Sequence, residues 1–282
     1  MKVIGSVKED LSLEKRISIT PETTKKFTGL GFNINLEKGY AEHLGLKDKE
    51  YEINGAAFSE SGKDVLKKSE IILKVNFPSE DEINLIKDKS IFIGQFDPKI
   101  SKELNEKLIK KEIKIFSLNL LPRITRAQSM DVLSSQANLA GYKAVIESFS
   151  NFTKAIPMMM TAAGTIPAAK VLVIGAGVAG LQAIATAKRM GAIVFATDVR
   201  TASKEQVESL GGKFLTVEDV EDLETEEGYA KEASDDFKQK QEALLTETLK
   251  KIDIVICTAL IPGKKAPLII KESMIKNMKP GS

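Results

Sequence analysis

The chain has 282 residues, of which 43% are hydrophobic and 28% charged, a composition typical of a soluble globular protein and not of a disordered one. The net charge of +2 gives general nucleic-acid binding no electrostatic basis. The one cysteine excludes a disulfide framework and a multi-thiolate metal site, and the one histidine removes most histidine-based metal and acid/base chemistry, so no metal is expected. No apolar run could cross a bilayer, and the charged N-terminus is not a secretory signal. We therefore expect a cytoplasmic protein without direct membrane insertion, associated with a membrane only through a partner.

The first portion of the chain alternates short apolar runs with charged, helix-compatible stretches. Strands are predicted over 3–7, 32–36, 71–75, 90–94 and 113–116, and helices over 21–30, 80–87 and 101–111. The strict alternation within 32–36 is typical of a half-buried strand. Strands that alternate with helices predict a parallel sheet covered by helices, so we expect a Rossmann-like (flavodoxin-like) domain over 1–126.

Residues 127–165 are predicted to form a linking helix and loop, because the sequence pattern changes there. Apolar residues recur at helical spacing from 131 to 152 and predict one long helix that joins two domains. Pro157, Gly164 and Pro167 then break the chain before its most apolar strand.

The second domain is expected over 166–282. Strands are predicted over 171–174, 193–197, 213–216 and 252–258, and helices over 178–190, 203–210, 235–250 and 271–278. A doubly wound dinucleotide-binding sheet usually has six strands, so we expect either a piece of a longer protein or a sheet that a partner completes. The predicted class is α/β, with two Rossmann-like doubly wound parallel-sheet domains joined by a long helix.

A glycine-rich segment directly follows the strand at 171–174 and opens the next helix. Residues 175–180 read G-x-G-x-x-G, and Asp198 ends the following strand, 18 positions after Gly180. In such a turn the first glycine makes the tight bend, the second lets the backbone approach a pyrophosphate, and the third lets helix and strand pack. Gly175, Gly177 and Gly180 are thus predicted to hold a dinucleotide at a helix N-terminus. A glycine-rich turn with no ligand is the alternative.

The identity of the cofactor depends on two residues after the second strand of this domain. Asp198 is expected to hold the ribose hydroxyls, and its carboxylate would repel a 2′-phosphate, which favours NAD(H) over NADP(H). Arg200 argues against this preference, since a nearby arginine can accommodate the 2′-phosphate of NADP(H). Its alternative role is a surface side chain that caps a helix or pairs with Glu205.

A polar loop joins the last strand of the first domain to the long helix. Arg123, Gln128 and Asp131 in this loop could form a hydrogen-bonded cluster, because loops at the carboxyl ends of parallel strands are where such folds bind ligands. From the residues alone, a capped helix start with solvated charges is the favoured interpretation.

Four stretches, 126–136, 175–191, 196–200 and 258–264, resemble the NAD(H)-binding domain I of proton-translocating NAD(P)+ transhydrogenases, and the resemblance runs from Met1 to Ser282. It reverses the interpretation of the polar loop. It implies that an Arg-Gln-Asp loop positions the nicotinamide without acid/base chemistry. The residues concerned are Arg123, Gln128, Asp131 and Ser134.

The resemblance also assigns residues to the rest of the cofactor. Gly228 and Tyr229, within an acidic segment, inherit the role of a mobile loop that closes over the nucleotide. The implied nucleotide contacts further comprise Val178, Ala179, Val199, Arg200, Gln241, Ala259 and Leu260.

Partners follow from the same resemblance. It implies a homodimer that docks with the NADP(H)-binding domain and the membrane domain of a Re/Si-specific transhydrogenase, on the cytoplasmic face of the inner membrane. NAD(H) would bind here and NADP(H) on the partner domain, and the chain would be active only with its partner domains. The family domain continues beyond the position of Ser282, which agrees with the small number of strands.

Alanine dehydrogenase, which shares much of the N-terminal pattern, is the rival. In that enzyme the residues at the positions of Arg16 and Lys74 hold a keto acid and a histidine handles protons, but here Gln95 follows the corresponding strand and His43 lies elsewhere. Oxidation of an amino acid needs a base near neutral pKa, whereas hydride transfer between nicotinamides does not. We therefore expect Arg16 and Lys74 to pair with carboxylates. A non-catalytic NAD-sensing module is a third hypothesis.

Overall fold

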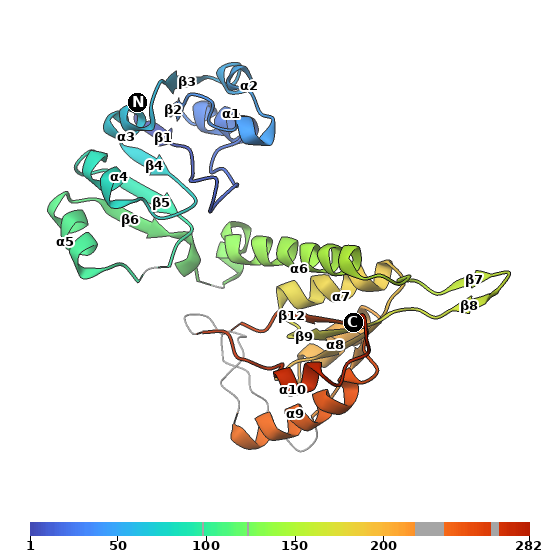
Figure 1. Ribbon diagram of the computed structural model, residues 1–282. Helices are drawn as coiled ribbons and strands as arrows, with labels where there is room; N and C mark the ends of the chain where they lie inside the picture. Colours follow the sequence, from blue (N-terminus) through green and yellow to red (C-terminus); the bar gives the residue numbers. More distant parts are fainter. Residues whose placement is uncertain (98, 123, 218–233, 261–264) are drawn as a thin grey trace. The chain divides into compact units, whose positions relative to one another are not determined.

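The computed structural model describes residues 1–97, 99–122, 124–217, 234–260 and 265–282. Contacts within the chain divide it into two compact units, Met1–Val132 and Leu133–Ser282 (Figure 1). Each unit is built on a parallel sheet, which confirms the predicted α/β class. The division at 126/127 and 165/166 stays a prediction, since the boundary by contacts falls within the first turn of the long helix.

The first unit carries a six-stranded parallel sheet of order β3-β2-β1-β4-β5-β6. Its strands are β1 (Val3–Ser6), β2 (Asn33–Glu37), β3 (Ala56–Ser59), β4 (Ile71–Leu73), β5 (Ile91–Gly94) and β6 (Lys114–Ser117). Its helices are α1 (Pro21–Gly29), α2 (Asp48–Glu52), α3 (Gly62–Lys68), α4 (Glu80–Leu85) and α5 (Lys102–Lys110), with short 3-10 turns at Glu42–Leu44, Leu118–Leu120 and Thr125–Met130. This is the Rossmann strand order with its reversal between β1 and β4, so the flavodoxin-like arrangement is wrong for this unit.

Two features of this sheet differ from the sequence predictions. The segment with α2, β3 and α3 has no counterpart among the predicted elements, because short elements of mixed composition carry little periodicity. Strand β2 is not half-buried: Asn35, on its polar face, is 8% exposed and accepts a hydrogen bond of 3.0 Å from Ser59 Oγ on β3. An interior strand of a doubly wound sheet is covered on both faces, so its polar residue needs a partner inside the protein.

The second unit carries a four-stranded parallel sheet of order β11-β10-β9-β12. Its strands are β9 (Lys170–Ile174), β10 (Ile193–Thr197), β11 (Lys213–Phe214) and β12 (Ile254–Cys257). Its helices are α6 (Val132–Asn151), α7 (Val178–Arg189), α8 (Ser203–Ser209), α9 (Asp235–Leu249) and α10 (Glu272–Ile275). The order repeats that of the first four strands of the first sheet, and again the order reverses beside the strand that begins the fold.

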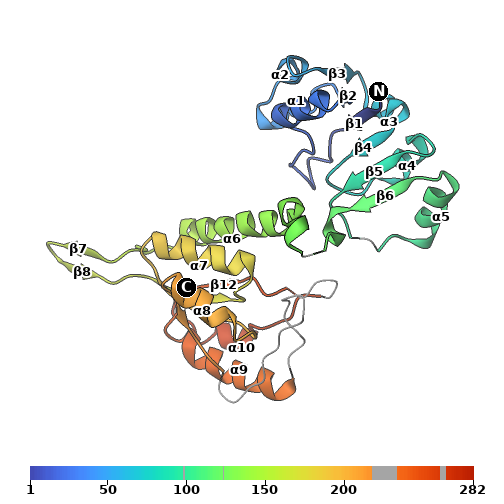
Figure 2. The ribbon, with the colours of Figure 1, turned by 180° about the vertical axis from the view of Figure 1, so that it is seen from behind.

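Alternate residues of β9 divide the core of this unit into two layers. Val171 and Val173 pack in one cluster with buried residues of α6, α7 and α8, whereas Leu172 and Ile174 pack with α9 and α10. Figures 1 and 2 show α6 beside α7 from opposite sides. The long helix thus covers the same face of the sheet as the helix that follows the glycine-rich turn.

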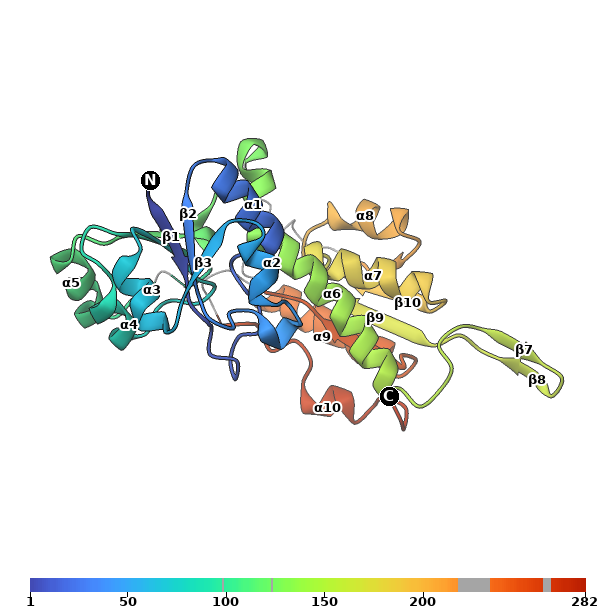
Figure 3. The ribbon, with the colours of Figure 1, turned by 90° about the horizontal axis from the view of Figure 1, so that it is seen from above.

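An antiparallel hairpin, β7 (Met159–Thr161) and β8 (Gly164–Ile166), lies between α6 and β9. The sequence predicts only breaks in the chain here. All six strand residues are exposed, and the hairpin stands out from its unit in Figure 3. Within the described ranges, no helix has the length and apolar character needed to span a membrane.

Candidate nucleotide-binding site

The turn between β9 and α7 uses its three glycines in three different ways. Gly175 has a φ of +93°, and a Cβ there would lie 2.9 Å from the amide nitrogen of Ala259. A Cβ at Gly180 would lie 1.8 Å from the carbonyl oxygen of Gly175. At Gly177 the nearest heavy atom to a Cβ would be Nη2 of Arg200, 4.0 Å away. The fold itself therefore requires Gly175 and Gly180, whereas Gly177 leaves open space.

That open space adjoins the N-terminus of α7. Gly177 is the N-cap residue and has no side chain to cap the helix, and its carbonyl accepts the first helical hydrogen bond from Leu181 at 2.8 Å. The amides at the start of a helix have no intrahelical acceptor and carry partial positive charge, which suits a phosphate. The residues present thus fit the pyrophosphate of a dinucleotide, at the place that the sequence predicts.

Both neighbouring strands hold the turn in position. The Gly175 amide donates to the carbonyl of Thr197 on β10 at 2.9 Å. On the other side, the hydroxyl of Thr258, directly after β12, donates to the carbonyl of Gly175 at 2.7 Å. The turn therefore lies where the strand order reverses, which is where open α/β sheets bind ligands. Thr258 belongs to the site although sequence reasoning does not single it out, because a threonine at a strand end carries no signal of such a contact.

Asp198 is tied to the same turn. Its side chain is 6% exposed, and Oδ2 accepts a hydrogen bond of 2.6 Å from the amide of Ala176. Oδ1 accepts hydrogen bonds of 2.9 Å from both the amide and Nε of Arg200. Burial by itself would raise the pKa of Asp198, but the hydrogen bonds and charge of Arg200 and the Ala176 amide outweigh it, so the pKa lies below its ordinary value. The carboxylate is therefore ionised beside the glycine-rich turn.

Arg200 pairs with Asp198, whereas the sequence offers Glu205 as the alternative carboxylate. The Arg200 side chain is 17% exposed. Its guanidinium contacts the Asp198 carboxylate and also lies next to Gly177. Its charge is thus already balanced within the site. This pairing weakens the reservation that Arg200 selects a 2′-phosphate.

The other predicted nucleotide contacts are distributed over the second unit. Ala259 adjoins Gly175, and Leu260 is 68% exposed just beyond it. Gln241 is 9% exposed on the buried face of α9, one turn before Leu245. Val178 and Ala179 form the first turn of α7, and Val199 is partly buried between Asp198 and Arg200.

The predicted nicotinamide loop is described only partially. Gln128 is exposed in the 3-10 turn, and its carbonyl accepts a hydrogen bond of 3.2 Å from the amide of Asp131. Ser134 is partly buried in the first turn of α6, within the second unit. Arg123, Gly228 and Tyr229 lie outside the described residues.

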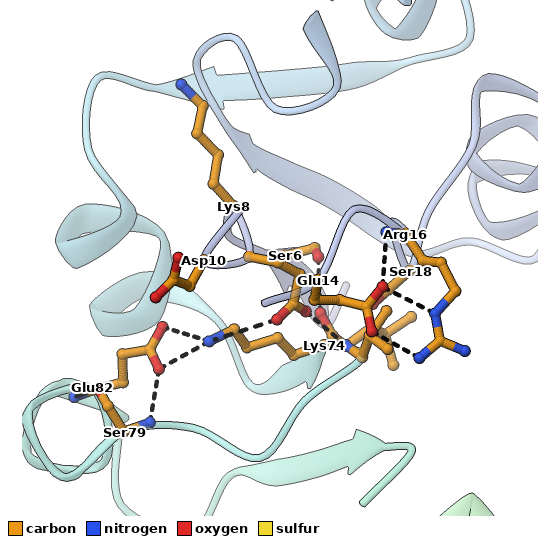
Figure 4. A network of polar contacts seen from close by, with 12 residues as sticks. Ser6, Lys8, Asp10, Glu14, Arg16, Ser18, Lys74, Ser79 and Glu82 are labelled. Carbon is orange, nitrogen blue, oxygen red and sulfur yellow. Dashed lines mark hydrogen bonds and ion pairs between the residues drawn. The ribbon is translucent and has the colours of Figure 1, made fainter. Parts of the chain in front are cut away.

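The corresponding reversal point of the first sheet has a different chemistry (Figure 4). Arg16 forms an ion pair of 2.6 Å with Glu14, and Lys74 one of 2.8 Å with Glu82. Glu9 lies 3.9 Å from Lys74 and accepts a hydrogen bond of 2.6 Å from the Val75 amide. The prediction that Arg16 and Lys74 pair with carboxylates is confirmed.

Two of the charged side chains at this point, Lys74 and Glu9, are buried. Burial raises the pKa of Glu9, and the Val75 amide and Lys74 offset this only incompletely. Gln95 accepts a hydrogen bond of 3.0 Å from Arg16, and His43 instead donates to the Lys15 carbonyl at 2.8 Å. Among the described residues, no group of three or more His, Cys, Asp or Glu is placed to hold a metal ion.

Residues 5–140 match the family model "Alanine dehydrogenase/PNT, N-terminal domain", and residues 144–282 match "Alanine dehydrogenase/PNT, C-terminal domain". The chain therefore belongs to the alanine dehydrogenase/PNT family.

Within this family the chain is more similar to transhydrogenase subunits than to alanine dehydrogenases. It is 49% identical over 286 residues to the first part of NAD(P) transhydrogenase subunit alpha of Rhodospirillum rubrum, covering 99% of this chain and 74% of that protein. The crystal structure of transhydrogenase from Sinorhizobium meliloti matches with a TM-score of 0.86 and 45% identity, over 100% of this chain and 76% of that one. Alanine dehydrogenase of Methanococcus maripaludis is 27% identical over 283 residues, 99% of this chain and 70% of that enzyme. The relationship to alanine dehydrogenase is the more distant one.

Proposed function

We propose that this chain is the NAD(H)-binding component of a proton-translocating NAD(P)+ transhydrogenase. It would exchange hydride directly between its own NAD(H) and NADP(H) on a partner domain, in a Re/Si-specific reaction coupled to proton movement across the membrane. One observation carries the binding half of the proposal: the turn at Gly177 is open toward the N-terminus of α7 and has an ionised Asp198 beside it. The 49% identity to a transhydrogenase subunit supports the reaction.

The residues of the chain would act by binding and orientation. The amides of α7 would hold the pyrophosphate at Gly177, and Asp198 would accept hydrogen bonds from the ribose, with Val199, Gln241, Ala259 and Leu260 as further contacts of the nucleotide. The nicotinamide supplies the hydride chemistry when it is bound. Arg123, Gln128, Asp131 and Ser134 would orient it, and Gly228 and Tyr229 would belong to a loop that closes over the nucleotide.

Partners are proposed on the same basis. The relatives are alpha subunits of NAD(P) transhydrogenases, and an alpha subunit implies further components of the enzyme in those organisms. We place this chain as a homodimer that docks with the NADP(H)-binding domain and the membrane domain, on the cytoplasmic face of the inner membrane. Activity would require those partner domains.

Mixing the chain with the NADP(H)-binding domain tests the proposal against its two rivals. Reduction of an NAD analogue by NADPH should occur only in the mixture, whereas an alanine dehydrogenase would turn over alanine with NAD by itself. An NAD-sensing module would bind NADH without any exchange in the mixture. Absence of exchange with intact binding would therefore overturn the transhydrogenase assignment.

A further inference from the structure

Helix α6 contains a glycine at its centre, Gly141, in a run of 20 helical residues. A glycine inside a helix is destabilising relative to alanine, so its presence there calls for a reason in packing. Gly141 is buried, and a Cβ at this position would lie 2.0 Å from the carbonyl oxygen of Ala179 and 2.9 Å from its carbonyl carbon. The reason is thus a close approach of two backbones.

The backbone that it touches belongs to the proposed binding site. Ala179 lies in the first turn of α7, two residues after Gly177. Since the contact is with the main chain, no change of rotamer could make room for a side chain at Gly141. The helix that packs on α7 therefore contacts it at the phosphate-binding end.

On the same face of α6, the buried side chains increase in size toward the C-terminal end of the helix. Gly141, Val145 and Phe149 follow one another at intervals of four residues and are all buried. Val145 and Phe149 share a core cluster with Ala183 and Ala187 of α7. Side-chain volume sets the separation of packed helices, so this gradient brings α6 nearest to α7 beside the glycine-rich turn.

Helix α6 also carries Ser134, seven residues before Gly141. At 1.5 Å per residue the two lie about 10 Å apart along one continuous helix. A displacement of the helix at Gly141 would therefore be transmitted to Ser134, because an α-helix is stiff over two turns.

We propose that Gly141 is a positioning residue: its contact with Ala179 sets the distance between the phosphate-binding turn and the Ser134 end of α6, and with it the placement of the nicotinamide ribose. This inference rests on the proposed function. It adds that the spacing is held by main-chain contact between two helices, outside the residues that touch the nucleotide.

Gly141→Ala tests it, because the added methyl must push α6 away from α7 by about 1 Å. A misplacement of that size can slow an oriented reaction by ~100-fold. We expect hydride exchange with the NADP(H)-binding partner domain to fall by roughly 10–100-fold, while the affinity for NADH, measured by fluorescence titration, changes by less than about fivefold. Val145→Ile enlarges the next residue of the same face and should give a smaller effect in the same direction, which keeps the test open if Gly141→Ala folds poorly.

Ala140→Gly is the matched control, since Ala140 is exposed on the same helix. It should lower thermal stability slightly and leave exchange unchanged. Unchanged exchange in both Gly141→Ala and Val145→Ile, or an equal loss of exchange and affinity, would overturn the inference. Failure of the wild-type chain to bind NADH or to exchange hydride would instead overturn the proposed function.

Discussion

The two sheets of this protein share a strand order but differ in what stands at the point where that order reverses. In the second unit a glycine-rich turn of six residues, 175–180, joins β9 to α7 and leaves helix amides open beside Gly177. In the first unit the segment 7–20 joins β1 to α1, contains no glycine and brings carboxylates to the reversal point. One point suits an anionic phosphate, whereas at the other the cations Arg16 and Lys74 are already paired with carboxylates.

This difference shows that topology supplies only a location for ligand binding. At the second reversal point, backbone amides would bind a phosphate, and their approach to it requires glycine. At the first, Lys74 is 8% exposed between Glu9 and Glu82, so its charge joins the segments that follow β1 and β4 to helix α4. Variants at the first reversal point should therefore change mainly stability, and variants at the second should change nucleotide binding.

The largest expected effect is on stability and concerns the first unit. Lys74→Met would leave the buried Glu9 and the partly buried Glu82 without their cation, and such a loss costs about 3–5 kcal/mol. Urea denaturation followed by circular dichroism would measure it. Lys38→Met is the control, because the Lys38–Glu60 pair is exposed and should contribute less than ~1 kcal/mol. Equal losses in the two variants would show that the pairing of Lys74 with Glu9 and Glu82 has no special role.

A steric change in the second unit comes next. In Gly180→Ala the new methyl meets the carbonyl of Gly175, so the turn must open. Overpacking against backbone costs about 1–3 kcal/mol, and we expect NADH binding to fall below detection in calorimetry. Gly29→Ala, at the end of α1, meets no heavy atom within 4 Å, so it should leave NADH affinity unchanged and should not lower stability. Retained NADH affinity in Gly180→Ala would argue that the dinucleotide binds elsewhere.

A chemical change at the same site should weaken nucleotide binding. Asp198→Asn removes the charge that would face the ribose in the proposed function, and we expect NADH affinity to drop by about 1–3 kcal/mol. Asp253→Asn is matched to it, since Asp253 also accepts a backbone hydrogen bond, from Lys170 at 2.8 Å, but at the opposite end of β9. Its NADH affinity should equal that of the wild type. The ribose assignment fails if the two variants bind NADH alike.

The smallest effect is on pH dependence, where the two carboxylates should have opposite signs. The pKa of Asp198 is lowered, so its contribution to stability is present above pH 3.8 and lost as the pH falls further. The pKa of Glu9 is raised by burial, so the folded state binds its proton more tightly and the wild type gains stability as the pH falls toward 4.5. Urea denaturation between pH 3 and 7 would compare the wild type with Glu9→Gln and with Asp198→Asn. Differences of the same sign for both variants would contradict these assignments.

The elements that follow from the sequence are those with strong periodicity and flanking signals. Thr20 accepts a hydrogen bond from the Thr23 amide ahead of Pro21 and starts α1 at the predicted position, and β10 has the predicted bounds. Elements of low periodicity, α2, β3 and the β7–β8 hairpin, escape prediction, because their residues are stabilised by tertiary neighbours or stand exposed. The pattern of 32–36 correctly predicts a strand and wrongly a half-buried one, since alternation does not distinguish a solvated face from one covered by a helix.

The amino-acid sequence by itself determined the α/β class, the glycine-rich turn with Asp198, and the lack of a histidine beside Gln95, because local propensity and motif spacing are written along the chain. Only the tertiary structure decided that Arg200 lies on Asp198, that Thr258 holds Gly175, and that Gly141 lets α6 touch Ala179. These contacts join residues whose partners are selected by packing, and packing is a property of three-dimensional distances that no spacing in the sequence encodes.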